Sequence, residues 1–189
     1  FCPEDDCMQV LINLSMDSND SIHCAFYDLE LHPLIEAFEL KKEILGLVLD
    51  DENYEKNTFI LRNLSEKIII DSSGTLMHNK FCIFDGTAVA TGSFNPTVRG
   101  NYHNNNNLVV IRSGYLAKNY EEEYMELRKN TQGHELRASY PAVVLNGNLI
   151  ENHFCPEDCS PFIFTRLMDS ANESIHFMTF SFTNDDIGD

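Results

Sequence analysis

Hydrophobic and polar positions along this chain alternate between strand-like and helix-like segments. Short apolar runs predict strands over 21–29, 45–49, 67–71, 76–84, 87–91 and 108–111. Apolar residues at helical spacing predict helices over 4–16, 32–43, 54–64 and 115–129. Helices that alternate with buried strands are typical of a layered α/β domain. We therefore expect a layered sheet of mostly parallel or mixed strands, flanked by helices.

An internal repeat sets the domain organisation. The segment 1–5, Phe-Cys-Pro-Glu-Asp, returns as 154–158, which is 153 positions later. Similarity at a fixed offset indicates a duplicated unit, here of about 150 residues. We expect residues 1–150 to form one domain, with 130–151 as the linker. Residues 151–189 would then be the start of a truncated second copy.

Composition and charge narrow the classes of partner. The chain is 43% hydrophobic and 23% charged, as in ordinary globular proteins. Its 13 Lys and Arg against 30 Asp and Glu give a net charge of -17, which disfavours indiscriminate nucleic-acid binding. The segment 75–112 differs in charge, because it contains three basic residues, Lys80, Arg99 and Arg112, and one acidic residue, Asp85. Such a basic stretch suits a phosphate site.

The sequence says little about compartment. No apolar run reaches the length of about 20 residues that a spanning helix needs, and no signal-peptide pattern is present. We expect a soluble chain whose natural N-terminus is missing, because it begins at Phe1, and its location stays open. Cys24 and Cys82 lie in apolar runs and are expected to be buried free thiols. For Cys2 and Cys7, a disulfide or free thiols are favoured over a zinc site.

A group of polar residues with fixed spacing carries the chemistry. The sequence from His78 to Asn95 fits the pattern H-x-K-x4-D-x6-G-S-x-N. Two residues apart on a strand, His78 and Lys80 would point to one side. After a turn at Asp85, the next strand would return Ser93 and Asn95 to the same place. Convergent ammonium, hydroxyl and amide donors match the several oxygens of a phosphoryl group.

This pattern resembles the motif of the phospholipase D superfamily, and the sequence looks like a microbial phospholipase D-like domain. The resemblance implies that His78 is the nucleophile or general acid. It implies that Lys80, Ser93 and Asn95 hold the substrate phosphate. Asp85 completes the catalytic motif in a structural role, and Gly92 is also matched.

One position departs from the family pattern. Many members carry a glutamate before the strand that follows the motif, where it orients and polarises the histidine. Here the run 104–107 is Asn-Asn-Asn-Asn, with Asn106 at the corresponding position. An amide can orient a ring but cannot stabilise an imidazolium as a carboxylate does. We expect Asn106 to orient His78 and to activate it more weakly; a polar loop is the alternative interpretation of the other asparagines.

The mechanism implied by the resemblance is attack of His78 on phosphorus, through a covalent phosphohistidine and without metal or other cofactor. A second histidine would protonate the leaving oxygen. We expect it to come from a second motif, either in a missing C-terminal half or in a homodimer partner.

Three functions remain open from the sequence. The leading prediction is a phosphodiesterase or phosphatidyltransferase acting on phospholipid. The alternatives are an endonuclease of the same superfamily, against which the acidic balance weighs modestly, and a non-catalytic scaffold half.

Overall fold

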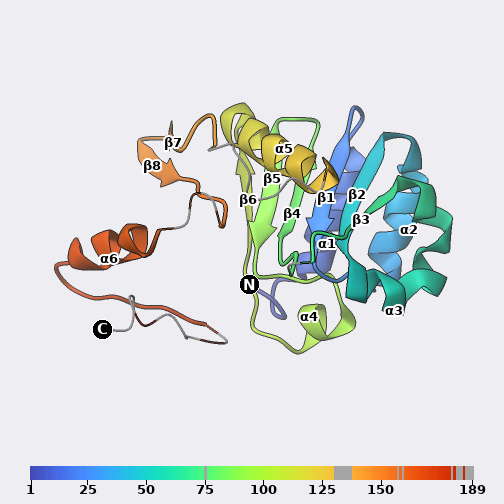
Figure 1. Ribbon diagram of the computed structural model, residues 1–189, viewed down its shortest axis with the longest axis horizontal. Helices are drawn as coiled ribbons and strands as arrows, with labels where there is room; N and C mark the ends of the chain where they lie inside the picture. The colour runs from blue at the N-terminus through green and yellow to red at the C-terminus, as the bar shows by residue number, and fades with distance from the viewer. Residues whose placement is uncertain are drawn as a thin grey trace.

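A six-stranded mixed sheet forms the centre of the molecule (Figure 1). The computed structural model describes residues 1–74, 76–129, 138–156, 158, 160–179, 181 and 185. The strand order is β3-β2-β1-β4-β5-β6, with β1 to β3 parallel and the other neighbours antiparallel. The strands are β1 (Ile22–Phe26), β2 (Leu45–Asp50), β3 (Ile68–Asp71), β4 (Lys80–Phe84), β5 (Ala88–Gly92) and β6 (Leu108–Arg112).

Helices cover both faces of this sheet. They are α1 (Cys7–Asp17), α2 (His32–Leu40), α3 (Asp51–Leu61), α4 (Val98–Tyr102) and α5 (Gly114–Lys129), with 3-10 turns at Lys42–Ile44 and Arg62–Lys67. Capping side chains begin several of them: Asp50 accepts from the backbone of Asn53 at the start of α3. The predicted layered α/β architecture is confirmed.

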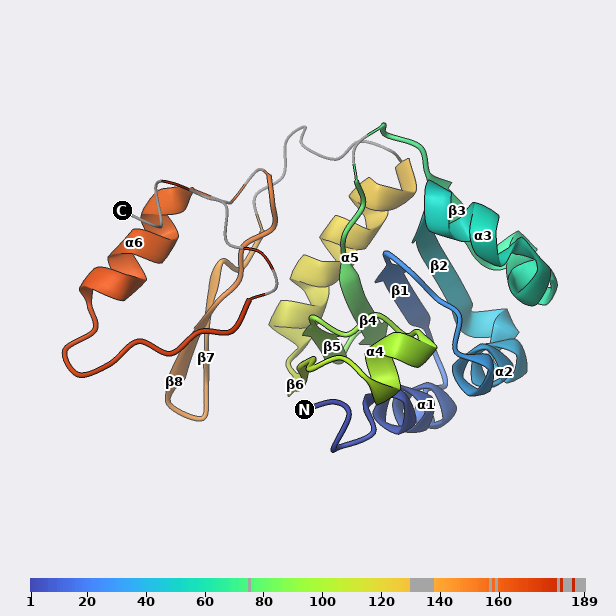
Figure 2. The ribbon, with the colours of Figure 1, turned by 90° about the horizontal axis from the view of Figure 1, so that it is seen from below.

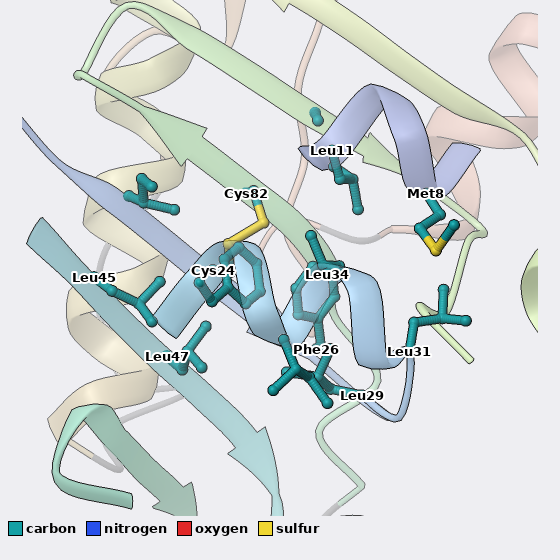
Figure 3. Packing of buried hydrophobic residues seen from close by; sticks show 14 of the residues in the cluster. Met8, Leu11, Cys24, Phe26, Leu29, Leu31, Leu34, Leu45, Leu47 and Cys82 are labelled. Atoms are coloured by element: carbon teal, nitrogen blue, oxygen red, sulfur yellow. A yellow bond between two sulfur atoms is a disulfide. The ribbon is translucent and has the colours of Figure 1, made fainter. Parts of the chain in front are cut away.

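Alternation along the strands creates two cores. Leu47 of β2 points to the face covered by α1 and α2 (Figure 3), and Leu49 belongs to the same core, whereas Val48 belongs to the core under α5. All three side chains are buried. Strands buried on both faces explain why the sequence shows continuous apolar runs.

The expected free thiols of Cys24 and Cys82 were a wrong prediction, because the two residues form a disulfide in the core (Figure 3). They are directly opposed in the antiparallel β1–β4 pair, with 4.1 Å between their Cα atoms. Opposed residues in antiparallel strands lie close enough to be bridged. The pairing joins positions 58 apart in sequence, so no local pattern indicates it.

Three segments differ from the predicted elements. Residues 76–79 are not part of a strand, because the paired register of β1 and β4 ends at Phe26 opposite Lys80, and beyond it one backbone bond, from Tyr27 to Asn79, continues the pairing. The polar loop after β5 contains the short helix α4. Within the predicted linker, β7 (Ala142–Leu145) and β8 (Asn148–Glu151) form an antiparallel hairpin.

Helix α6 (Pro161–Asp169) follows the hairpin and lies away from the sheet (Figure 1). In the repeat it corresponds to α1. The hairpin region contacts α5 through the buried amide of Asn119, which donates to the side chain of Asn152 and to the carbonyl of Tyr140. The boundary near residue 150 and the truncated second copy stay predictions.

None of the helices in the described residues is long and apolar enough to cross a membrane.

Candidate active site

The motif residues lie mainly at one end of the sheet. Strand β4 begins at Lys80, and its antiparallel neighbours β1 and β5 end at Phe26 and Gly92. The loops after β1 and β5, together with His78, therefore meet at this edge. Helix α4 lies there as well, in front when the molecule is viewed from below (Figure 2). The register of β4 with β1 and β5 therefore brings the His78–Lys80 part of the motif and the loop with Ser93 and Asn95 to the same end of the sheet, as predicted.

His78 and Lys80 are coupled by a short contact. Lys80 Nζ donates to the carbonyl oxygen of His78 at 2.6 Å. Burial lowers the pKa of Lys80 to about 8, because the charged ammonium loses water. Burial, and then the charge of Lys80, also lower the pKa of His78, while Asp50 opposes the shift. The site therefore favours a neutral imidazole beside an ammonium group that is half deprotonated near pH 8.

Tyr27, which sequence reasoning missed, contacts both of these residues. Its ring meets the imidazole of His78 edge to face, with 4.8 Å between centroids and 66° between planes. Lys80 Nζ lies 5.2 Å from the centroid of the same ring. The backbone N–H of Tyr27 donates to the carbonyl of Asn79 at 3.0 Å and extends the β1–β4 pairing. Its place just after a strand that ends at the site was the available signal.

Asp85 lies at the other end of β4, away from His78. Its carboxylate accepts backbone N–H bonds from Asp20 at 2.8 Å and Ser21 at 3.0 Å, and from Asn19. Burial would raise the pKa of Asp85, but these backbone donors outweigh it and the net pKa is lowered. Its contacts thus fix the entry to β1, which agrees with the structural role that the resemblance implies.

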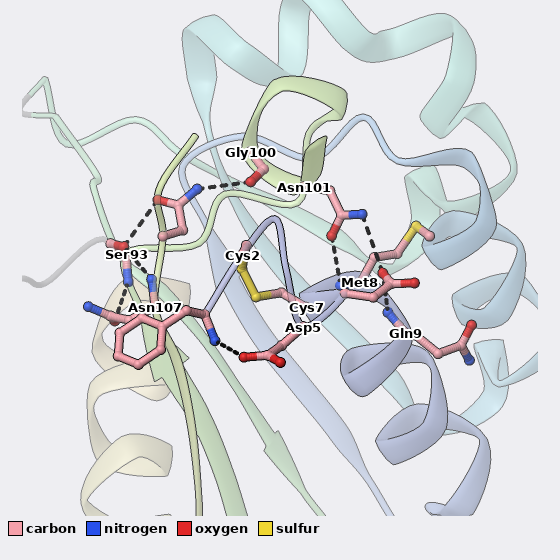
Figure 4. The surroundings of a disulfide bond; sticks show 12 residues. Cys2, Asp5, Cys7, Met8, Gln9, Ser93, Gly100, Asn101 and Asn107 are labelled. Carbon is pink, nitrogen blue, oxygen red and sulfur yellow. Dashed lines mark hydrogen bonds and ion pairs between the residues drawn. A yellow bond between two sulfur atoms is a disulfide. The ribbon is translucent and has the colours of Figure 1, made fainter. Parts of the chain in front are cut away.

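Ser93 is held by the asparagine run (Figure 4). Its hydroxyl donates to Asn106 Oδ1 at 3.1 Å and accepts from the backbone N–H of Asn107 at 3.0 Å. Its own N–H donates to Asn107 Oδ1 at 3.2 Å. A β-carbon on Gly92 would overlap the carbonyl oxygen of Asn107, so this close approach requires glycine. The Ser93 hydroxyl therefore uses its proton for a hydrogen bond to the asparagine run.

Asn106 makes different contacts from the ones its predicted role needs. Its amide oxygen accepts from Ser93, and its amide nitrogen donates to the carbonyl of Gly100 at 3.0 Å. These are the hydrogen bonds of its side chain in the described residues, and neither reaches His78. Among the described residues, no hydrogen bond therefore supports the predicted orientation of His78 by Asn106.

Asn95 is positioned by α4. A β-carbon on Gly100 would overlap the backbone oxygen of Asn95, so the glycine allows this loop to rest on the helix. Asn95 Oδ1 is buried and has no hydrogen-bond partner among the described residues. The Asn95 side-chain oxygen is thus buried without a partner among the described residues, whereas the Ser93 hydroxyl forms two hydrogen bonds. The role of Gly100 was not predictable from the sequence, because a single glycine outside any motif has many explanations.

The N-terminal disulfide lies beside the loop that carries Asn106 and Asn107 (Figure 4). Cys2 and Cys7 are bonded and buried. The backbone N–H of Cys2 donates to the carbonyl of Asn106 at 2.9 Å, and Asn106 returns the bond at 3.2 Å. Asn101 Oδ1 accepts from the N–H of Met8, which ties α4 to α1. Of the alternatives left open for Cys2 and Cys7, the structure contains the disulfide.

Comparisons with known proteins agree with this geometry. A family model described as "Cardiolipin synthase, PLD-like domain" matches residues 12–128. The phospholipase D of Rickettsia typhi is 26% identical over 141 residues, which cover 71% of this chain and 69% of the relative. The mitochondrial cardiolipin hydrolase of Xenopus tropicalis is 36% identical over 67 residues. That match covers 35% of this chain and 32% of the relative.

Solved structures share the fold. Nuc from Salmonella typhimurium, a phospholipase D family member, superposes with a TM-score of 0.64 at 22% identity. The match covers 68% of this chain and 91% of that one. NucT from Helicobacter pylori superposes with a TM-score of 0.57 at 16% identity, over 66% of this chain and 89% of that one. With its motif, its sheet and the matched family model, the chain belongs to the phospholipase D superfamily.

Proposed function

We propose that the protein is a phosphodiesterase that works through a covalent phosphohistidine, with phospholipid as the favoured substrate class. The observation that carries the proposal is the placement of His78 and Lys80 at the end of the sheet where Asn95 also lies, with Lys80 Nζ bonded to the His78 carbonyl and the pKa of the partly buried His78 lowered by burial and by the charge of Lys80. A nucleophile needs its lone pair, and a phosphodiester needs a cation to balance its charge.

The steps follow from the chemistry of the diester. A ring nitrogen of His78 attacks phosphorus in line, and the bond from phosphorus to the leaving oxygen breaks as the phosphohistidine forms. The ammonium of Lys80 balances the charge of the phosphoryl oxygens, and the Asn95 amide N–H and the Ser93 hydroxyl donate hydrogen bonds to them, for which the Ser93 hydroxyl must leave Asn106. A second histidine gives its proton to the leaving oxygen and then takes one from water, which cleaves the P–N bond. That histidine would come from a second motif, in cis or in a partner copy. No cofactor takes part in this scheme.

Two observations support lipid over nucleic acid. The net charge of -17 opposes long-range attraction of nucleic acid, although its weight is modest because an anionic membrane surface is repelled as well. The curated relatives include phospholipases D and cardiolipin hydrolases by name. An endonuclease of the same superfamily remains the alternative, because a local basic channel would suffice for DNA. A scaffold half without catalysis is the third.

The test is turnover of a chromogenic phosphodiester in the presence of chelator. We expect activity that His78→Ala removes and that survives in His103→Ala, a matched change at an exposed histidine of the loop after α4. A quench at high pH should preserve a phosphohistidine that mass spectrometry locates on residue 78. The assay is run across a range of protein concentration with size-exclusion chromatography, so that activity can be assigned to monomer or dimer.

Phospholipid vesicles and single-stranded DNA are then compared as substrates. Release of headgroup or phosphatidic acid without DNA cleavage supports the lipid assignment, and the reverse supports the endonuclease. Absence of turnover on every substrate, from folded full-length protein at dimer-forming concentration, would contradict the enzyme and favour the non-catalytic scaffold.

A further inference from the structure

The imidazole of His78 needs a group to fix its orientation, and the expected residue does not supply one. Asn106 uses its amide oxygen for Ser93 and its amide nitrogen for Gly100. Among the described residues the His78 ring forms no side-chain hydrogen bond, and its aromatic contact is Tyr27. An unattached ring would sample many orientations, which lowers the fraction of time in which a nitrogen faces phosphorus.

Tyr27 is placed to restrict both catalytic side chains at once. Its ring packs edge to face against His78, a geometry that aromatic pairs prefer. The ammonium of Lys80 lies 5.2 Å from the centroid of the same ring. A cation near an aromatic face is attracted by the ring quadrupole, so the contact favours the charged form of Lys80 and its position.

The Tyr27 backbone is itself held on two sides. Its N–H bonds to the carbonyl of Asn79, the residue between the two catalytic side chains. Three and four residues on, the backbone N–H groups of Glu30 and Leu31 both donate to the carbonyl of Pro96, next to Asn95. The loop after β1 is thus joined to β4 and to the loop after β5. A ring on a loop that is anchored in this way stays in place, and it can therefore restrict the side chains that it contacts.

We infer that Tyr27 is a positioning residue of this site, whose ring orients the imidazole of His78 and holds the ammonium of Lys80. The inference rests on the proposed phosphodiesterase function. It assigns to an aromatic face the orienting task that a carboxylate performs in many members of the superfamily. The ring, and not the hydroxyl, carries the role.

The experiment compares Tyr27→Leu with Tyr27→Phe and with a matched tyrosine elsewhere. Tyr140 is also half-buried, meets Tyr115 edge to face at 4.8 Å, and has Lys118 Nζ at 5.4 Å from its ring. Tyr140→Leu therefore removes the same two kinds of contact, neither of which involves His78. For each protein we would measure kcat and KM on a chromogenic phosphodiester, the single-turnover rate of phosphohistidine formation, and the melting temperature.

We expect Tyr27→Leu to slow phosphohistidine formation by at least about 10-fold, since misplaced reactants cost large factors in rate. Tyr27→Phe should restore the rate to within about 3-fold of wild type, because the ring quadrupole remains. Tyr140→Leu should leave the rate of phosphohistidine formation unchanged. It should lower the melting temperature by about as much as Tyr27→Leu does.

Two outcomes separate this inference from the proposed function. If wild type is active and Tyr27→Leu forms phosphohistidine at the wild-type rate, Tyr27 does not position His78. The same holds if Tyr27→Phe is as slow as Tyr27→Leu, since the hydroxyl would then carry the effect. If wild type itself has no turnover, it is the proposed phosphodiesterase that fails.

Discussion

Gly100 offers a sharp test of how the site loop is supported. A β-carbon there would overlap the backbone oxygen of Asn95 and lie 3.1 Å from Thr97 Oγ1. The N–H of Gly100 donates to that hydroxyl at 2.9 Å, and its carbonyl accepts from Asn106. A backbone oxygen cannot rotate away as a flexible side chain can. Gly100→Ala must therefore displace α4 or the loop that carries Asn95.

The size of the effect follows from two opposing terms. Alanine is favoured over glycine within a helix by about 1 kcal/mol. Overpacking costs about 1–3 kcal/mol, and the upper part applies here because the overlapping atom belongs to the backbone. We expect the free energy of unfolding to fall by about 1–2 kcal/mol, which lowers the melting temperature of a chain this long by about 2–8 °C. Activity should fall by about 10- to 100-fold, because Asn95 moves.

Gly114→Ala is the matched control. The nearest atom to a β-carbon there is the backbone oxygen of Gly86 at 3.9 Å, an ordinary contact. Gly114 also begins a helix, so alanine should leave stability unchanged or raise it by up to about 1 kcal/mol. Thermal unfolding and kcat/KM on a chromogenic phosphodiester measure both variants. Equal stability and full activity in Gly100→Ala would refute the argument that this glycine supports Asn95.

Three further predictions concern the charge and covalent bonds of the domain. Because burial lowers the pKa of Lys80 to about 8, kcat/KM should fall as pH rises through that value. Lys80→Arg keeps its charge, so any activity it retains should not show this fall, and an unchanged alkaline limb would contradict the assignment. Asp85→Asn should lower the unfolding free energy by about 1–3 kcal/mol at pH 7 in urea titrations, with Asp17→Asn as the exposed control. The folded-state pKa of Asp85 is lowered from the ordinary 3.8, so the difference from wild type should be full above 3.8 and disappear as pH falls through the folded value. Replacing Cys24 and Cys82 by alanine should cost about 4 kcal/mol, the chain-entropy value for a separation of 58, and an unchanged urea midpoint would show that the bond does not stabilise the fold.

The elements that the sequence predicted well are those with a local cause. Strand β2 appears as an apolar run because both of its faces are buried. Helix α5 appears through its amphipathic spacing. Helix α4 has only the residues Val98–Tyr102, which is too short for any periodicity to show. The strand predicted over 76–84 begins only at Lys80, because its extent depends on where the neighbouring strand ends.

For the same reason, the motif was predictable and its supporting residues were not. The spacing from His78 to Asn95 is fixed by one hairpin, so it is visible in a short stretch of sequence. The contact of Tyr27 with His78 and the bond between Cys24 and Cys82 depend on the register of β1 against β4. That register joins positions more than 50 residues apart, and no local pattern encodes it.

The asparagine at position 106 does more than omit the negative charge of a glutamate. Its amide accepts from Ser93 and donates to the carbonyl of Gly100, a pair of bonds that needs both ends of an amide. A glutamate could accept from Ser93 but would set a carboxylate against the Gly100 carbonyl. A negative charge near His78 would also counteract the burial that lowers its pKa.

Asn106→Glu should therefore not improve catalysis, although it restores the residue that many family members carry. We expect kcat/KM at neutral pH to fall by about 10-fold or more, because the loop that holds Ser93 moves. Stability should fall by about 1–3 kcal/mol for the lost hydrogen bond. Asn104→Glu adds the same charge at an exposed position of the same loop and should change neither quantity by much. A rise in kcat/KM in Asn106→Glu would mean that orienting His78 with a carboxylate outweighs the loop support, and that the asparagine here limits the rate.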